Sequence, residues 1–503
     1  MNPPIVSLRH RLPIWLIPVL WTFALGCWGL SRQQSVWRDE AATWQVAERS
    51  TAQIWHMFGQ VDAVHGLYYL LMHGVFACFG ASTTTLRLPS VLAMAVAAGC
   101  VAVIGRRLAG GWAGLGGGLA FGLLPAVQFQ LQEGRPYALV TAGAGISTLL
   151  LMTALTSPRH RRGLWAAYGG TVLVCGLLNW LSLLILPAHL ATLVWRQAEC
   201  GLWKRWAAAS AVGTVCVLPL ILFTRSQSQQ VSWIPPLSWH MMIGPAVLLA
   251  IGGLAALTDR RRKVGQSVAA VGLPLLAVPQ IALIGISLIR PMFLERYILF
   301  SFLGLALLIG AALGATVRAA MLKFPRAYVC VLPAVLTVAT VALLPQSVAK
   351  RSPESRVDDV LAIASDVRRL KRTGDGVLFV PAARRDTKSV SPEAFTGLRD
   401  IALMESPEAS GTLKGVEADP ARIRAAMLAQ MEILLVTDAP EAATSVTSAR
   451  DKVKLSVLDE HFTAVAAERV RGRQVTVYRR LGPATSWRMA EGGRESLIMY
   501  APK

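Results

Sequence analysis

Long stretches of apolar residues recur along the first two thirds of the chain and stop near Pro345. Runs of roughly 16–24 such residues follow one another from Leu12 to Leu344, and a helix needs about 20 to cross a bilayer. Lipid cannot satisfy exposed backbone polar groups, so repeated runs of this kind predict membrane-spanning helices. We therefore expect a polytopic α-helical membrane protein with about 11–13 spans.

The pattern changes after residue 345, where charged positions become frequent. Short segments with the pattern of β-strands lie at 375–381, 432–438 and 474–480. Stretches with helical periodicity lie between them. The sequence therefore predicts two domains, a membrane domain over 1–345 and a soluble α/β domain over 346–503.

Basic residues give the chain a formal net charge of +21, which in a soluble protein would suggest a nucleic-acid partner. Here 54% of the residues are hydrophobic and only 16% are charged, and the basic residues gather in short loops. These loops lie at the N-terminus and at 157–163, 197–206, 259–263 and 318–326. Such clustering is typical of cytoplasmic loops, so we expect a multi-pass protein of the plasma membrane and no nucleic-acid partner.

This orientation places the segments between the basic loops, and the C-terminal domain, on the extracytoplasmic side. One region conflicts with it, because an even number of crossings must separate the outer segments 31–65 and 127–136. Three apolar runs lie between them, at 66–80, 86–105 and 112–126. Either the first of these runs is not a complete crossing, or the division into runs is different.

Polar side chains near a membrane are costly and are candidates for function, and four outer segments carry them. The segments are 31–65, about 127–136, about 224–238 and about 288–297, each taken with the first residues of the apolar run that follows it. Their candidate residues are Asp39, Glu40, Asp62, His65, Tyr68, Tyr69, Glu133, Arg135, Tyr137, Arg290, Arg296 and Tyr297. Arginine binds phosphate oxygens through a planar fork, and a carboxylate can accept a proton from a hydroxyl. This set fits transfer of a group from a phosphate-linked donor that lies in the bilayer.

The same segments carry a resemblance to a known family. The acidic pair in "WRDEAATW", the stretch "GLYYLL", the turn "QEGRPYAL" and the late "ERY" occur in that order. Over roughly residues 10–345 the chain resembles GT-C-type membrane glycosyltransferases. The nearest branches would be the protein O-mannosyltransferases, the aminoarabinose transferases and actinobacterial membrane enzymes. The resemblance implies inverting transfer of a sugar, of the mannose or pentose class, from a polyprenyl phosphate to an acceptor hydroxyl outside the membrane.

The resemblance also implies roles for particular residues. Asp39, the first acidic residue of the pair, would be the general base, with Glu40 as an orienting or acceptor-binding partner. We expect Arg135, Arg296, Tyr297 and Arg290 to bind the donor phosphate. The remaining site candidates are Asp62, His65, Tyr68, Tyr69, Glu133 and Tyr137. Family members often read His-Pro-Pro-Leu-Tyr-Tyr where this chain has "AVHGLYY", so no catalytic histidine is carried over.

The expected partners are a polyprenyl-phosphate sugar, a glycan, lipid or protein acceptor, and membrane lipids. No cofactor is implied, although Asp39 and Glu40 could bind a divalent metal. The residues also allow plainer interpretations. The acidic pair suits the first turn of a helix, and an arginine at the end of a span can extend to the interface. Two other functions stay open, a transporter or flippase for lipid-linked glycans and a non-catalytic scaffold for envelope assembly.

Overall fold

The computed structural model describes residues 13–32, 34–156, 162–227, 234–259, 267–372, 374–443 and 447–481. Contacts divide the chain into two compact units. The membrane unit comprises Met1–Gln33 and Asp62–Ser352, and the soluble unit comprises Gln34–Val61 and Pro353–Lys503. Residues 34–61, which the sequence placed in the membrane domain, therefore pack with the C-terminal residues instead.

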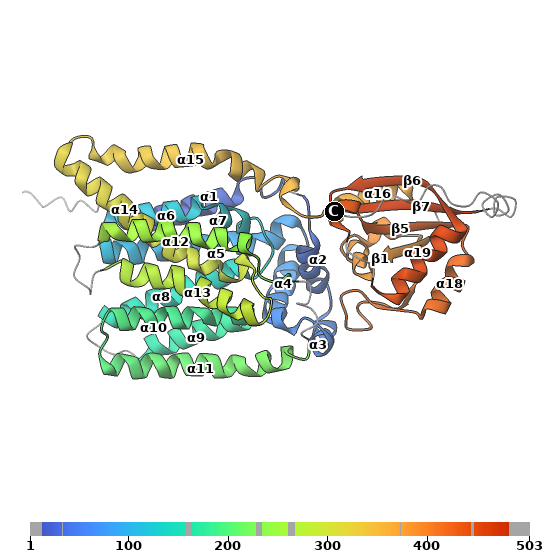
Figure 1. Cartoon of the computed structure of the whole chain (residues 1–503), viewed down its shortest axis with the longest axis horizontal. Helices are drawn as coiled ribbons and strands as arrows, with labels where there is room; N and C mark the ends of the chain where they lie inside the picture. The colour runs from blue at the N-terminus through green and yellow to red at the C-terminus, as the bar shows by residue number, and fades with distance from the viewer. Residues whose placement is uncertain are drawn as a thin grey trace, which may run out of the picture. The chain divides into compact units, whose positions relative to one another are not determined.

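The membrane unit is a bundle of helices (Figure 1). Its helices are α1 (Leu16–Cys27), α4 (Gly66–Phe79), α5 (Thr83–Ala109), α6 (Gly111–Leu123), α7 (Pro125–Gln130), α8 (Tyr137–Thr156), α9 (Arg162–Leu178), α10 (Ile185–Trp195), α11 (Cys200–Thr224), α12 (Ile243–Ala256), α13 (Ala269–Ile289), α14 (Phe302–Lys323) and α15 (Val331–Ala349), with 3-10 segments η1 (Ala63–His65), η2 (Trp180–Leu184) and η7 (Glu295–Ser301). Among the described residues, 7 helical segments are long and apolar enough to cross a membrane, and shorter apolar helices accompany them. The predicted multi-pass membrane protein is confirmed.

Small residues let the central helices of this bundle approach closely. A Cβ atom on Gly114 of α6 would lie 2.3 Å from the carbonyl oxygen of Ala102 on α5. A Cβ atom on Gly310 of α14 would lie 2.4 Å from the carbonyl oxygen of Ala113 on α6. Only glycine fits at such backbone contacts, which are typical of helix packing in lipid. The glycine-rich run 109–122 therefore holds α5, α6 and α14 together.

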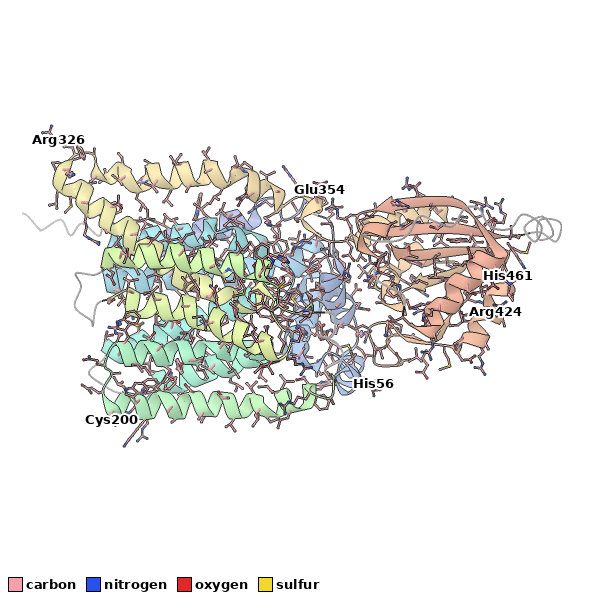
Figure 2. All side chains as sticks on the ribbon, viewed as in Figure 1. His56, Cys200, Arg326, Glu354, Arg424 and His461 are labelled. Carbon is pink, nitrogen blue, oxygen red and sulfur yellow. The ribbon has the colours of Figure 1, made fainter. Side chains whose placement is uncertain are left out.

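Residues of two basic loops and the start of α4 lie at opposite ends of the bundle. Figure 2 shows Cys200 and Arg326, from two of the basic loops, at the same end. From Cys200 the helix α11 runs to the other end, where the side-chain Oε1 of Gln227 accepts a hydrogen bond of 3.1 Å from the backbone N–H of Ala63. The other predicted basic loops include residues 1–12, 157–161 and 260–263, which lie outside the described residues. That the basic end faces the cytoplasm stays a prediction.

Helix α4 corresponds to the first of the three apolar runs before residue 127. Its 14 residues extend over about 21 Å, and the hydrocarbon core of a bilayer is about 30 Å thick. Figure 1 shows α4 at one end of the bundle, and it packs only lightly against α5 and α9. The helical segment Ala63–Phe79 is one of the shorter apolar helices of the bundle, and α6 is no longer than α4, so the number of crossings before residue 127 stays open.

The soluble unit is a mixed sheet covered by helices on both faces (Figure 1). Its elements are α2 (Arg38–Ala47), α3 (Thr51–Gln60), α16 (Val360–Leu370), β1 (Gly376–Val380), α17 (Asp386–Val390), β2 (Arg399–Asp400), β3 (Leu403–Glu405), β4 (Val416–Glu417), α18 (Pro420–Leu428), β5 (Glu432–Asp438), α19 (Ala449–His461), β6 (Phe462–Val470) and β7 (Arg473–Arg480). The main sheet has the order β2-β1-β5-β7-β6. Strand β1 pairs in parallel with β2 and β5, and β7 pairs antiparallel with β5 and β6. The three strands that the sequence predicted are β1, β5 and β7, so the predicted α/β fold is confirmed.

Continuous apolar stretches form the centre of this sheet because both of its faces are covered. On one face, Ile363 and Val367 of α16 pack against Val377 of β1. On the other face, Ile423 of α18 and Val457 of α19 pack against residues of β1 and β5. Strand β1 is buried at every position for this reason.

A buried ion cluster attaches α2 to the C-terminal part of this unit. Asp358 accepts hydrogen bonds from the backbone N–H of Arg38 at 3.0 Å and from Nη2 of Arg473 at 3.1 Å. Nη2 of Arg473 also donates to Oδ2 of Asp386 at 2.6 Å. Burial acts to raise the pKa of Asp358. The charges of Arg473 and Arg38 lower it by more than burial raises it, so the resulting pKa lies below the usual value. A backbone hydrogen bond of 2.7 Å from Val360 to Val36 completes the attachment.

Replacing Asp358 with alanine should therefore destabilise the soluble unit by about 1–3 kcal/mol, because the buried guanidinium of Arg473 loses one hydrogen-bond partner while Asp386 still pairs with it. In the native chain the depressed pKa of Asp358 stabilises the fold above the ordinary carboxyl pKa of about 3.9. That stabilisation should be lost as the pH falls through the lower pKa of the folded state. Hydrogen exchange of the α2 and β7 amides in the full chain measures both effects.

The matched control is Glu393→Ala, which breaks an exposed ion pair with Arg368 (3.4 Å) in the same unit. Exposed pairs contribute at most about 1 kcal/mol, so α2 should keep its protection in this variant. Equal loss of protection in the two variants would show that the buried cluster does not hold α2 in place.

Candidate functional site

Asp62 is the centre of a polar cluster at the start of α4. Its backbone has a φ of 58°, in the left-handed region that aspartate tolerates better than most residues. Its carboxylate accepts hydrogen bonds from Nδ1 of His65, at 2.9 Å, and from the hydroxyl of Tyr69. Burial acts to raise the pKa of Asp62, but its hydrogen bonds with His65 and Tyr69 and the charge of Arg135 lower it, and the resulting pKa lies below the usual value. Asp62 is therefore a carboxylate in this cluster.

His65 links this cluster to the second outer segment. Nη2 of Arg135 lies 3.1 Å from Nε2 of His65. Because Nδ1 of His65 donates to Asp62, the hydrogen-bond network assigns the tautomer in which Nε2 accepts from Arg135. Asp62, His65 and Arg135 thus form one hydrogen-bonded chain. This chain of hydrogen bonds orients the guanidinium of Arg135, a buried residue with 6% of its surface exposed.

The fourth outer segment reaches the same place through Tyr137. The guanidinium carbon of Arg296 lies 5.7 Å from the centre of the Tyr137 ring, a cation–π distance. The Tyr297 and Tyr137 rings are 5.8 Å apart between centroids. Since Arg135 and Tyr137 are two residues apart, the segment 135–137 contacts both the His65 side and the Arg296 side. Two arginines from segments far apart in sequence are therefore held near one end of the bundle.

The turn that carries Arg135 is packed against α5. The backbone carbonyl of Glu133 accepts a hydrogen bond of 2.6 Å from the hydroxyl of Ser90, and Glu133 is 1% exposed. A Cβ atom on Gly134 would lie 2.4 Å from the side chain of Leu86. Glycine is thus required where this turn approaches α5, and the contact fixes the direction in which Arg135 leaves the turn.

The other predicted site residues of the membrane unit lie in different surroundings. Tyr68 is fully buried on α4, whereas Tyr69, also fully buried, belongs to the Asp62 cluster through its hydroxyl. Arg290 is exposed at the C-terminal end of α13. Gln227, which contacts η1 as described above, is not among the predicted residues because a neutral glutamine in "TRSQSQQ" carries no charge signal.

Asp39 and Glu40 begin α2 in the soluble unit. Glu40 is fully buried, and Asp39 is partly exposed. Both lie in the first turn, where negative charge suits the helix dipole. The backbone N–H of Arg38 is bound by Asp358, so capping of the first amide does not require Asp39. Because these two residues and Arg135 belong to different units, the predicted common site of Asp39, Arg135 and Arg296 stays a prediction.

Metal binding has no further structural support in the described part of the chain. No group of 3 or more His, Cys, Asp or Glu side chains suited to a metal ion occurs among those residues. A requirement for a divalent metal at Asp39 and Glu40 is therefore a question for experiment.

Comparisons with known proteins identify the fold. No family model and no curated protein sequence matches the chain. Among solved structures, ArnT from Cupriavidus metallidurans in the apo state has 16% sequence identity and a TM-score of 0.59, over 92% of this chain and 97% of ArnT. ArnT bound to undecaprenyl phosphate gives 15% identity and a TM-score of 0.55, with coverage of 92% and 97%.

A third similar structure is the oligosaccharyltransferase AglB from Archaeoglobus fulgidus, in complex with an inhibitory peptide and a dolichol-phosphate. It has 11% identity and a TM-score of 0.50, over 92% of this chain and 73% of AglB. At such low identity these matches identify the fold alone. The chain has the fold shared by these GT-C membrane proteins, as the sequence motifs predicted.

The chain of hydrogen bonds from Asp62 to Arg135 predicts energetic coupling between these residues. The changes in unfolding free energy caused by Asp62→Ala and Arg135→Ala should differ from additivity by about 0.5–3 kcal/mol in the double variant, because both residues contact His65. The measurement is a double-mutant cycle on the unfolding free energy of the detergent-solubilised full chain. As a control, Asp62→Ala with Arg326→Ala should be additive within about 0.5 kcal/mol, since Arg326 lies at the other end of the bundle. Equal coupling in the two cycles would contradict the connection through His65.

Proposed function

We propose that this protein transfers a sugar, of the mannose or pentose class, from a polyprenyl-phosphate donor to an acceptor hydroxyl at the outer face of the plasma membrane. One observation carries the proposal: Arg135 and Arg296 both lie near Tyr137, and α14, which follows Arg296, ends at Lys323 in the basic loop 318–326. The fold supports it, because a solved structure with this fold is bound to undecaprenyl phosphate. In this orientation the C-terminal domain is extracytoplasmic.

In the proposed mechanism the arginines bind the donor phosphate. A guanidinium donates two parallel hydrogen bonds to phosphate oxygens, and it keeps its charge at any physiological pH. His65 orients Arg135, and the Tyr137 ring supports Arg296, so neither side chain needs to reorganise as charge develops on the leaving phosphate. Tyr297 and Arg290 are further candidates for donor binding. Asp62, Tyr69 and Glu133 act by positioning this group of residues.

Asp39 is the proposed general base. Its carboxylate removes the proton from the acceptor hydroxyl while that oxygen attacks the anomeric carbon of the sugar. The bond between the anomeric carbon and the phosphate oxygen breaks, and the polyprenyl phosphate leaves with both electrons of that bond. Attack from the opposite face inverts the configuration. Glu40 is the proposed orienting partner, and the acceptor is a glycan, a lipid or a protein.

Replacing Asp39 with asparagine should lower the rate of sugar transfer by about 10²–10⁴-fold, since the amide cannot accept the proton. The measurement is transfer by the purified full chain from a panel of polyprenyl-phosphate sugars. Glu441→Gln, at an exposed carboxylate in the same unit, should keep the native rate. Native activity in the Asp39→Asn variant would exclude Asp39 as the base. Addition of a chelator in the same assay tests whether a divalent metal takes part.

Replacing Arg296 with alanine should weaken binding of undecaprenyl phosphate by about 10-fold or more, because a charge-assisted contact of about 1.5–3 kcal/mol is lost. Arg296→Lys should recover only part of the affinity, since an ammonium lacks the planar fork. The shift in thermal unfolding on adding the lipid phosphate measures binding. Arg326→Ala, which removes an arginine at the other end of the bundle, is the control and should leave the shift unchanged. Loss of the shift in the control alone would place the phosphate at that other end.

A further inference from the structure

The soluble unit contains a polar cavity of about 320 Å³ that the proposed transfer mechanism does not use. It lies where α2 and α3 meet the C-terminal part of the same unit. It is lined by Gln45, Glu48, Arg49, Gln53, Arg385, Lys388, Ser389, Pro392, Asp400, Leu403, Ser406, Pro407 and Glu408. Most of these side chains are charged or carry an amide or a hydroxyl, so the cavity suits a polar ligand.

The walls of the cavity are fixed by hydrogen bonds. Arg385 forms ion pairs with Asp400 at 2.6 Å and with Glu417 at 2.7 Å, which immobilise its guanidinium. Nη2 of Arg49 donates to the carbonyl oxygen of Thr412 at 2.7 Å, which ties the end of α2 to the segment after β3. The cavity is therefore preformed between elements that are distant in the sequence.

Gln45 indicates what the cavity would bind. This residue is 6% exposed and lines the cavity, and its Oε1 atom has no hydrogen-bond partner among the described residues. A buried acceptor without a donor is costly, so such an atom normally has a partner. A ligand that donates a hydrogen bond would supply one. A hydroxyl group donates in this way, and an ionised phosphate oxygen does not.

The charges of the lining favour a neutral ligand. The cationic side chains are Arg49, Arg385 and Lys388, and the anionic ones are Glu48, Asp400 and Glu408. They balance in number, so the cavity has no net charge that would select a phosphate or another anion. Leu403 and two prolines are its apolar lining residues. Neutral hydroxyl-rich chains, which both donate and accept hydrogen bonds, fit this lining best.

We propose that this cavity is a binding subsite for a neutral, hydroxyl-rich glycan segment of the acceptor. That the bound glycan is the acceptor rests on the proposed function, whereas binding of a glycan in this cavity does not. Gln45 and Asp39 lie on the same helix, and six residues of an α-helix extend over about 9 Å. A glycan held at Gln45 would therefore be bound by the rigid element that carries the proposed base. The subsite would hold the acceptor while its terminal hydroxyl is presented elsewhere.

The test measures binding of soluble neutral manno- and arabino-oligosaccharides to the full chain in detergent, without any donor, by calorimetry. Gln45→Leu should weaken binding at least about 10-fold, the effect of about 1.4 kcal/mol. Gln60→Leu, at an exposed glutamine at the end of α3, should bind as the native chain does. Lys388→Met is a second variant in the lining that spares the buried core, and it should also weaken binding. Its control is Lys452→Met, at an exposed position on α19.

Several outcomes would overturn the proposal. They are absence of oligosaccharide binding, native affinity in both lining variants, or tighter binding of an uncharged peptide or of inorganic phosphate than of any oligosaccharide. A parallel transfer assay separates this proposal from the proposed function. Glycan binding without transfer by the native chain would contradict the transferase and leave the subsite. Transfer by a chain that binds no free oligosaccharide would contradict the subsite and leave the transferase.

Discussion

The guanidinium of Arg473 is the group on which the arrangement of the soluble unit depends. It is fully buried between Asp358 and Asp386, and Asp358 in turn binds the first amide of α2. A buried charge of this kind is tolerated only while its partners stay in place. The position of α2 is therefore linked to the folding of a domain more than 300 residues later in the chain, as the separation of 320 residues between Arg38 and Asp358 shows. Both ends of α2 carry residues of interest, Asp39 at the first turn and Gln45 towards the cavity.

The same rule, that poorly solvated charges must be paired and oriented, organises the polar end of the membrane unit. Asp62, His65 and Arg135 are joined by successive hydrogen bonds, and Arg296 lies against the ring of Tyr137. Such pre-orientation is what a site for an anionic leaving group needs, because donors already in place stabilise developing charge without reorganising. The fold by itself does not establish the reaction, since unrelated activities can share a fold. The proposal therefore rests on these side chains together with the fold.

The departure from the family motif at "AVHGLYY" has a structural explanation. His65 stands where family members often have proline, and its two ring nitrogens contact Asp62 and Arg135. Gly66 begins α4 directly after it. A proline at position 65 could make neither side-chain contact. The histidine thus connects Asp62 with Arg135 through its side chain, a contact that a comparison of motifs alone would not reveal.

The sequence by itself determined the features that depend on local pattern. Apolar runs predicted the membrane helices, and alternation with apolar content predicted strands β1, β5 and β7. Clusters of basic residues predicted which loops lie together at one end of the bundle. Only the tertiary structure decided that residues 34–61 pack with the C-terminal domain and that Gln227 meets Ala63. These features arise from contacts between residues far apart in the chain. Neutral or buried groups at such contacts leave no periodic signal in the sequence, so the fold is needed to bring them together.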